Sequence, residues 1–523
     1  MAGRMDPSPE AALSDSLLLD RPATTAPFTA EVADLPAAQR EQIEIKPLRP
    51  IKERPPVADA VDPTQVMSVA EVGAAISSPP TAPLIPPPIA PPAAPNTFDG
   101  GVDNGTTIPP DTAGAVGPNH VFNPLNNNVW IFDRTGLLVA PIVSLDRFWS
   151  SLGNTGHTFD PRAAFDPQGG RYIFATMADA QRPTSRILIA VSTTNDPTQA
   201  FVSHAIQVDD AVQGQVWFDF PSVGFTADKI TVQINLFTRN GNQFAGSTIY
   251  AIDKQSIYNP PHQAPVQRFI LQNKGATQVP AVTYDGALND QYLVARWGGN
   301  IQGQGFLVAY RLSGNVALGQ ATLTQVGFLG TALTWDAFPP GDIGGQLGTA
   351  NRVAVGDDRI LAACVRNGRL YCCQAVMLPT GAPTRSGVQW WEIDIANWSV
   401  SQVGRIDDPT GAVCYAAPSL SVNAQNDVLV GHAQFSANIH PSGGYMLRRA
   451  GGQPQPSNLF APGQSTYFKT FGGPTNRWGD YSHAQVDPLN DVDFWTVQEF
   501  AGSVANNWAT KWAHIVPPPA TVV

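Results

Sequence analysis

The stretch DFPSVGFTADKITVQI, from Asp219 to Ile234, sets the pattern for most of this chain. It begins with an acidic residue, alternates apolar and polar positions, turns at an Ala-Asp pair and ends in a second apolar run. Such alternation is typical of a half-buried β-strand. The stretch therefore predicts two antiparallel strands joined by a tight turn.

Six further stretches repeat this pattern between Asp111 and the C-terminus. They are DTAGAVGPNHVFNPL at Asp111, DPRAAFDPQGGRYIFA at Asp160, VPAVTYDGALNDQYLVA at Val279, ANRVAVGDDRILAA at Ala350, APSLSVNAQNDVLVGH at Ala417 and GDYSHAQVDPLNDVDFWTV at Gly479. The copies are spaced roughly 50 to 70 residues apart, which suits a four-stranded propeller blade and is too long for the coils of a leucine-rich repeat. The sequence predicts an all-β fold, a single closed β-propeller of seven blades, with six to eight allowed.

Other apolar runs complete the expected blades. Those beginning at Ile187, Ser247, Phe306 and Trp390 are the expected third strands of successive blades. The last copy provides only three strands before the chain ends, so we expect the segment just ahead of Asp111 to supply the fourth. This pairing would join the two ends of the ring and remove an exposed strand edge.

The first 95 residues differ from all that follows. They contain the Pro-rich run APLIPPPIAPPAAP (82–95), the basic run KPLRPIKER (46–54) and almost no aromatic residues. Such a segment buries too little surface to offset its chain entropy, and its proline content favours an extended conformation. We expect residues 1–95 to be a disordered tether or docking segment, 96–517 to be the propeller and 518–523 a tail. A larger assembly could form through residues 1–95.

Composition excludes several classes of partner. Only 14% of the 523 residues are charged and the formal net charge is −11, which disfavours nucleic acid because its binding needs clustered Lys and Arg. No apolar run approaches the roughly 20 residues that cross a bilayer. The N-terminal SLLL is too short for a secretory signal. The expectation is intracellular assembly or export without a cleaved signal.

All four cysteines fall in the fifth and sixth copies, as Cys364, Cys372, Cys373 and Cys414. Their spacing does not match a zinc site. Buried thiols in strands are the simplest interpretation, because free cysteine is among the most buried residue types. A disulfide from Cys364 to Cys372 or Cys373 is the alternative, and the redox compartment stays open.

Acidic residues begin several copies at equivalent positions, where the chain meets an innermost strand. Carboxylates gathered around one axis repel each other unless a cation or arginine neutralises them, so a ligand site is one reading. The alternative is that each aspartate satisfies turn backbone or a neighbouring blade. The candidate ligand-binding residues are Asp111, Asp160, Arg162, Asp219, Arg296, Arg352, Arg477 and Asp480.

The run DPLNDVD, from Asp487 to Asp493, gathers hard oxygen ligands of the kind that calcium prefers. Its candidate metal ligands are Asp487, Asn490, Asp491 and Asp493. The run lacks the glycine and distal glutamate of an EF-hand, and a tight turn is the simpler explanation. We expect no required cofactor, with calcium as a possible ligand.

The motifs PPDTAGAVGPNHVF, DPRAAFDPQGGRYIFA, FDFPSVGF and NRWGDYSHAQVDPLNDVDFWTVQEF, in that order, resemble a bacterial family of β-propeller proteins. The resemblance covers about 110 to 516 and implies a propeller loosely similar to sialidase-like folds. It also implies an extracellular or cell-surface location. It does not imply sialidase activity, because fold does not dictate function.

Three functions remain in competition. The leading hypothesis is a non-catalytic binding or assembly module that presents loops to a protein or glycan partner and is tethered through its N-terminal extension. The rival is a sialidase-like glycoside hydrolase in which the arginines bind a carboxylate, Asp480 acts as acid or base and Tyr481 as nucleophile. It expects Asp-box turns, of which the sequence has no clear example. The third is a structural component of a particle or secretion machine.

Overall fold

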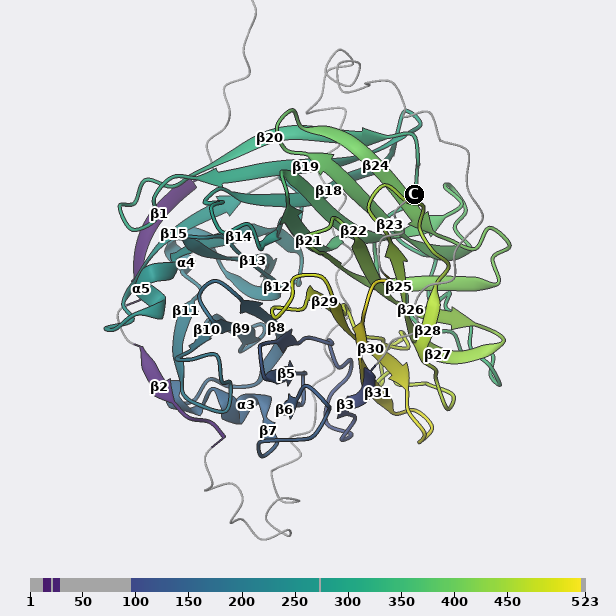
Figure 1. Ribbon diagram of the computed structural model, residues 1–523, viewed down its shortest axis with the longest axis horizontal. Helices are drawn as coiled ribbons and strands as arrows, with labels where there is room; N and C mark the ends of the chain where they lie inside the picture. The colour runs from purple at the N-terminus through teal and green to yellow at the C-terminus, as the bar shows by residue number, and fades with distance from the viewer. Residues whose placement is uncertain (1–12, 20–21, 29–95, 272–273, 519–523) are drawn as a thin grey trace, which may run out of the picture.

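The computed structural model describes residues 13–19, 22–28, 96–271 and 274–518. The chain is all-β, with only short helical turns at Leu145–Phe148 (α3), Ser150–Leu152 (η3), Asp210–Gln213 (α4) and Lys254–Tyr258 (α5) in the described part. Its strands form groups arranged around a common centre (Figure 1). No helix of the described residues is long and apolar enough to cross a membrane.

From Ala115 onward the strands follow one another in antiparallel groups of four. The first two groups are β4 (Ala115–Val116), β5 (His120–Pro124), β6 (Asn128–Asp133) and β7 (Val143–Ser144), then β8 (Thr158–Asp166), β9 (Arg171–Ala178), β10 (Arg186–Ser192) and β11 (Phe201–Gln207). The third and fourth are β12 (Val216–Phe225), β13 (Lys229–Thr238), β14 (Phe244–Asp253) and β15 (Ala264–Leu271), then β16 (Val279–Pro280), β18 (Gln291–Ile301), β19 (Gln304–Ser313) and β20 (Thr322–Thr331).

The next two groups are β21 (Ile360–Arg366), β22 (Arg369–Leu378), β23 (Arg385–Asp394) and β24 (Ser399–Ile406), then β25 (Val413–Val422), β26 (Val428–Ser436), β27 (Ile439–Arg448) and β28 (Asn458–Ala461). The last contains β29 (His483–Val486), β30 (Phe494–Ala501) and β31 (Trp508–Ile515). The runs predicted as third strands, which begin at Ile187, Ser247, Phe306 and Trp390, are confirmed as parts of the third strands β10, β14, β19 and β23.

The fourth strand of the last group comes from the other end of the body. β3 (Asn96–Val102) pairs antiparallel with β31, so the predicted pairing of a segment ahead of Asp111 with the final strands is confirmed. Phe98 of β3 lies beside the Trp512 ring, with 6.5 Å between ring centroids. The pairing covers the outer edge of β31 and joins residues more than 400 positions apart in the sequence.

The fifth copy was predicted one strand too early. Residues 350–356 form no strand beyond a single bridge between Val353 and Gly344, and the strand pair begins at Ile360. The residues predicted as its first strand belong instead to a long connection, 332–359. The alternation of Val353 and Val355 resembles a strand only locally. Both valines are buried against the sixth and last groups, which explains why they are apolar.

Neighbouring groups pack face to face, so their inner strands are buried on both sides. In β10 every residue from Ile187 to Val191 is at most 1% exposed. Strands buried on both faces have continuous apolar runs rather than alternation. Leucine and isoleucine of β10 accordingly divide between the core shared with the first group and the core shared with the third.

The first strands of successive groups meet at the centre. The short strand β17 (Val282–Thr283) pairs in parallel with both β12 and β21, through Phe225 and Cys364. The space left among these strands is small, about 80 Å³, and Arg162, Ser222, Ser419 and His483 contribute to its lining.

The four cysteines are free and buried. Cys372 and Cys373 lie opposite Ala363 and Ala362 rather than opposite Cys364, so the cross-strand pairing does not bring the thiols into register. Burial raises the pKa of the Cys364 thiol to about 12. The thiols are therefore apolar core groups, as the simplest interpretation expected.

Most of the predicted tether lies outside the described residues. Two parts are described, and both lie on the body: β1 (Leu13–Leu19) pairs with β15, and β2 (Ala23–Thr25) pairs with β11. Figure 1 shows them in purple at the outer rim of the third and second groups. The chain thus crosses two neighbouring sheets before it reaches residue 29.

Candidate functional site

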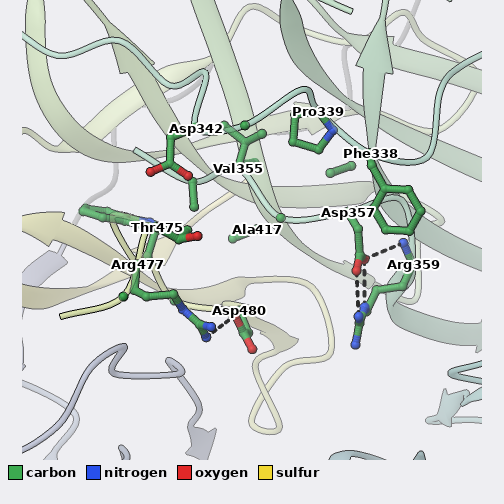
Figure 2. A pocket seen from close by; sticks show the side chains of 18 of the residues that line it. Phe338, Pro339, Asp342, Val355, Asp357, Arg359, Ala417, Thr475, Arg477 and Asp480 are labelled. Atoms are coloured by element: carbon green, nitrogen blue, oxygen red, sulfur yellow. Dashed lines mark hydrogen bonds and ion pairs between the residues drawn. The ribbon is translucent and has the colours of Figure 1, made fainter. Parts of the chain in front are cut away.

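A cavity of about 1350 Å³ opens beside the first strands β21 and β25, which contribute Leu361, Ala416 and Ala417 to its lining. Three connecting segments supply most of its lining: the turn 241–244 between β13 and β14, the long connection 332–359, and the connection 462–482 between β28 and β29. Figure 2 shows Arg477 and Asp480 on one side of the cavity and Asp357 and Arg359 on the other. We call this cavity the mouth pocket.

The two long connections brace each other through Asn476, which is 1% exposed. Its backbone N–H donates to Asp342 Oδ2 (2.7 Å), and its side-chain Nδ2 donates to the carbonyl oxygens of Arg352 and Tyr467 (both 3.0 Å). Gln346 and Tyr467 add two further bonds of 2.8 Å. Because these bonds satisfy buried backbone groups, the connections form fixed walls.

The acidic residues that begin the copies form hydrogen bonds with the backbone of neighbouring copies. Asp111 Oδ1 accepts from the Asp480 N–H (2.8 Å) and Oδ2 from Asn126 Nδ2 (2.7 Å). Asn126 Oδ1 then accepts from the Asp160 N–H (2.8 Å), and Asp160 Oδ2 from the Phe220 N–H (3.2 Å). This continuous series links the last, first, second and third groups.

Asp111 and Asp160 also have left-handed backbone, with φ of 48° and 55°. Aspartate and asparagine tolerate this region better than most residues because their short side chains bond to nearby backbone. Asp219 accepts from the following N–H of Phe220 (3.0 Å). The side chains therefore help to form the bends that lead into the innermost strands.

Burial raises the pKa of two of these carboxyl groups. Burial first, and then the charge of neighbouring Asp480, raises the pKa of Asp111 well above its usual range. Burial first, and then the charges of Asp219 and Asp480, raises the pKa of Asp160 to about 8. Asp111, Asp219 and Asp480 thus all lie close enough to Asp160 to act on its carboxyl group.

The four candidate arginines separate into two sets. Arg162 lies among the carboxylates, with Nε donating to the Pro221 carbonyl (2.8 Å) and its guanidinium carbon 3.2 Å from the Tyr481 ring centre. Arg477 pairs with Asp480 at 3.2 Å. The other two are engaged elsewhere: Arg296 with Asp358 (3.0 Å), and Arg352 with the Ile343 carbonyl (3.2 Å).

Tyr481 is only 1% exposed, and its hydroxyl donates to the Pro161 carbonyl at 2.9 Å. Burial raises the pKa of this phenol well above its usual value. Phe220 packs edge-on against it at 5.8 Å between ring centroids. Tyr481 is not among the residues that line the mouth pocket.

The candidate calcium ligands do not share one centre. Asp487 forms an ion pair with Arg134 and accepts from Trp495 Nε1 (2.9 Å). Asp491 pairs with Arg366 on another group, while Asn490 accepts from the N–H groups of Val492 and Asp493 and closes the turn. Asp487 and Asp493 do approach His514, which the sequence did not indicate. Calcium at this turn stays a prediction.

Several residues of the mouth pocket were not predicted. Asp357 accepts hydrogen bonds from Nε (2.8 Å) and Nη2 (2.6 Å) of Arg359. The Arg359 guanidinium carbon lies 4.2 Å from the Phe220 ring centre. Asp342 is half-buried in the wall, and burial raises its pKa. These residues belong to the 332–359 connection, whose length and Gly, Pro and Asp content were the only available signal.

No family model and no curated protein matches the chain. Among solved structures, the Dos1 propeller shares 10% identity over 76% of this chain and 75% of its own, with a TM-score of 0.36. The NanB sialidase from Streptococcus pneumoniae shares 8% over 76% and 82%, with a TM-score of 0.37. The phage phi92 endosialidase shares 7% over 68% and 66%, with a TM-score of 0.36.

These neighbours include propellers and sialidases, but at such low identities and TM-scores we take neither an activity nor a blade number from them. Nothing in these comparisons matches the specific motifs at the start and finish of the repeats. The resemblance to the bacterial propeller family stays a prediction.

Proposed function

We propose that residues 96–517 form a closed seven-bladed propeller that serves as a non-catalytic binding module, with a protein partner bound at the mouth pocket. The observation that carries the proposal is the fixed wall made by two long connections braced through Asn476 around a cavity of about 1350 Å³. Connections of this length that are held rigid on a repeat scaffold are the common place for recognition. The pairing of β3 with β31 supports ring closure.

Exposed apolar side chains on the two long connections favour a protein partner over a glycan. Phe468, Phe471 and Leu347 are 48%, 38% and 43% exposed on the two connections that form the walls. Phe471 also has φ of 45°, a strained conformation for a bulky residue and one that is common at functional loops. Exposed aromatic and aliphatic side chains on such connections are typical of protein interfaces.

Electrostatics indicates the kind of group that the partner presents. Both arginines of the pocket are paired, Arg359 with Asp357 and Arg477 with Asp480. Asp342 lines the wall, accepts the Asn476 N–H and lies near the charge of Arg477, but it forms no ion pair among the described residues. A lysine or arginine beside apolar residues would therefore complement this surface.

The glycan and glycosidase alternatives have less support. Trp297 and Trp478, the tryptophans beside glycine that could stack on a sugar, are each 4% exposed. In the glycosidase reading Tyr481 would have to leave its bond to Pro161 to reach a substrate. Assembly into a particle through residues 1–95, and an extracellular or surface location, rest on the sequence pattern alone.

The binding proposal can be tested by panning a random peptide library on the protein, beside a glycan array. We expect enriched peptides to carry a basic residue next to apolar ones. Phe468→Asp should weaken their binding about tenfold or more, because it puts a charge into the apolar contact. Leu489→Asp is the matched control, since Leu489 is 61% exposed on the turn at the other end of β29.

The alternative outcomes are distinct. If the glycan array yields ligands and the peptide library yields none, the partner is a glycan and the proposed protein partner is wrong. Peptides that bind Phe468→Asp as well as they bind the unmodified protein would place the binding surface elsewhere.

A further inference from the structure

The outer edge of β15 is covered by a strand from the N-terminal segment. β1 pairs with β15 over seven residues, from Leu13 opposite Ile270 to Leu19 opposite Ala264. Without β1, β15 would be the last strand of its sheet and would present a row of unpaired N–H and C=O groups. Such an edge is a template for any extended segment of suitable side chains.

The contact is specific as well as extended. Arg268 of β15 is 2% exposed, and its Nε donates to Asp15 Oδ1 at 2.8 Å. A second contact joins Nη2 to the other oxygen of Asp15, and Asp209 lies 3.3 Å from the same nitrogen. The guanidinium therefore relies on a carboxylate from the N-terminal segment for most of its pairing.

The strand also places its apolar side chains in alternation. Leu19 is 6% exposed and belongs to the core cluster that contains Val266 and Ala264, whereas Leu18 is 57% exposed. Ser14 and Ser16 face solvent on either side of Asp15. The edge of β15 thus selects an acidic residue and, four positions later, an apolar one.

We propose that this edge is a peptide-recognition site whose occupant is exchangeable, so that β1 of a second copy, together with its β2 on β11, can take the place of the chain's own β1 and β2. The contacts would be identical in the two arrangements, which is why exchange of an element between copies costs little. Residues 26–95 separate β2 from β3, and an extended chain of that length spans on the order of 200 Å, enough to reach a neighbouring copy. Concentration then decides between the two arrangements.

A pair of charge-reversed full-length variants tests the exchange. In the Asp15→Arg variant, the arginine at position 15 of β1 faces Arg268. In the Arg268→Asp variant, Asp15 of β1 faces Asp209 and the new aspartate. Each variant alone mismatches its own site. Mixed together, the two chains offer each other matched strands at both sites. We expect each variant alone to be monomeric by light scattering after size exclusion, and the mixture to form a one-to-one dimer.

The control is Ser16→Arg in place of Asp15→Arg, because it places the same arginine side chain on the solvent side of β1 and leaves Asp15 in place. Mixed with Arg268→Asp, it should yield no dimer. A mixture of the two reversed variants that stays monomeric overturns exchange between copies.

A second measurement tests the proposal even if the Arg268→Asp variant does not fold. A fluorescent peptide of residues 13–28 is added to the full-length Asp15→Arg protein, whose own strand is mismatched. We expect the native peptide to bind about tenfold more tightly than the same peptide with Asp15→Lys, since only the native one pairs with Arg268. Equal binding of the two peptides, or none, overturns the proposal.

Discussion

Trp512→Ala should lower the free energy of unfolding by about 3 to 5 kcal/mol, the usual cost of truncating a fully buried tryptophan. Trp512 is 0% exposed and lies where β3, the last group and the first group meet. Its ring faces Phe98 of β3 at 6.5 Å and Trp495 at 6.4 Å, and it lies against the backbone of Gly114. The substitution therefore weakens the pairing that joins the two ends of the body.

The measurement is urea unfolding, followed by tryptophan fluorescence and by circular dichroism. Leu318→Ala is the control, because Leu318 is 67% exposed and its truncation should change stability by no more than about 0.5 kcal/mol. A loss below about 1 kcal/mol for Trp512→Ala would contradict the closing role of this contact.

Asp160→Asn should stabilise the protein increasingly as the pH rises from 5 to 9. Because burial and neighbouring carboxylates raise the pKa of Asp160 to about 8, the folded state keeps a proton that the unfolded chain releases near pH 4. This contribution is complete below pH 4 and is lost as the pH rises through 8, at up to about 1.4 kcal/mol per pH unit. Asparagine cannot ionise, still accepts from the Phe220 N–H and tolerates φ of 55°.

The comparison is the difference in unfolding free energy between the variant and the unmodified protein, taken at each pH. Asp408→Asn is the control, because hydrogen bonds from Thr410 lower the pKa of that exposed carboxyl and it is ionised in both states over this range. A difference for Asp160→Asn that is constant between pH 5 and 9 would mean that Asp160 is ionised in the folded protein.

The strand pattern was predictable because each copy carries its own local signal. Alternation and turn residues located six of the seven strand pairs, and the count of strands after Gly479 pointed to a partner ahead of Asp111. The fifth copy misled because Val353 and Val355 are apolar for a different reason, their burial within a connection. An alternation of apolar and polar residues reflects burial of every second side chain, and a buried loop can show it as well as a strand.

The site was predictable only in part. Asp111, Asp160, Asp219 and Asp480 come together because equivalent positions of a repeat lie around one axis. Arg352 does not join them, because its guanidinium donates to the Ile343 carbonyl within the 332–359 connection. Asp342, Asp357 and Arg359 lie in the same connection, where no repeat fixes position. The contact of Asp15 with Arg268 was equally hidden, because the residues are 253 positions apart and nothing in the Pro-rich segment marks β1 as a strand.

The central claim is that the mouth pocket binds a partner and does not hydrolyse glycosides. Its most direct test is turnover of sialoside and other aryl-glycoside substrates by the unmodified protein, Asp480→Asn and Tyr481→Phe. We predict no substantial turnover by any of the three, because the Tyr481 hydroxyl is bonded to Pro161 and Asp480 is paired with Arg477. Robust turnover by the unmodified protein that vanishes in Asp480→Asn or Tyr481→Phe would contradict the claim.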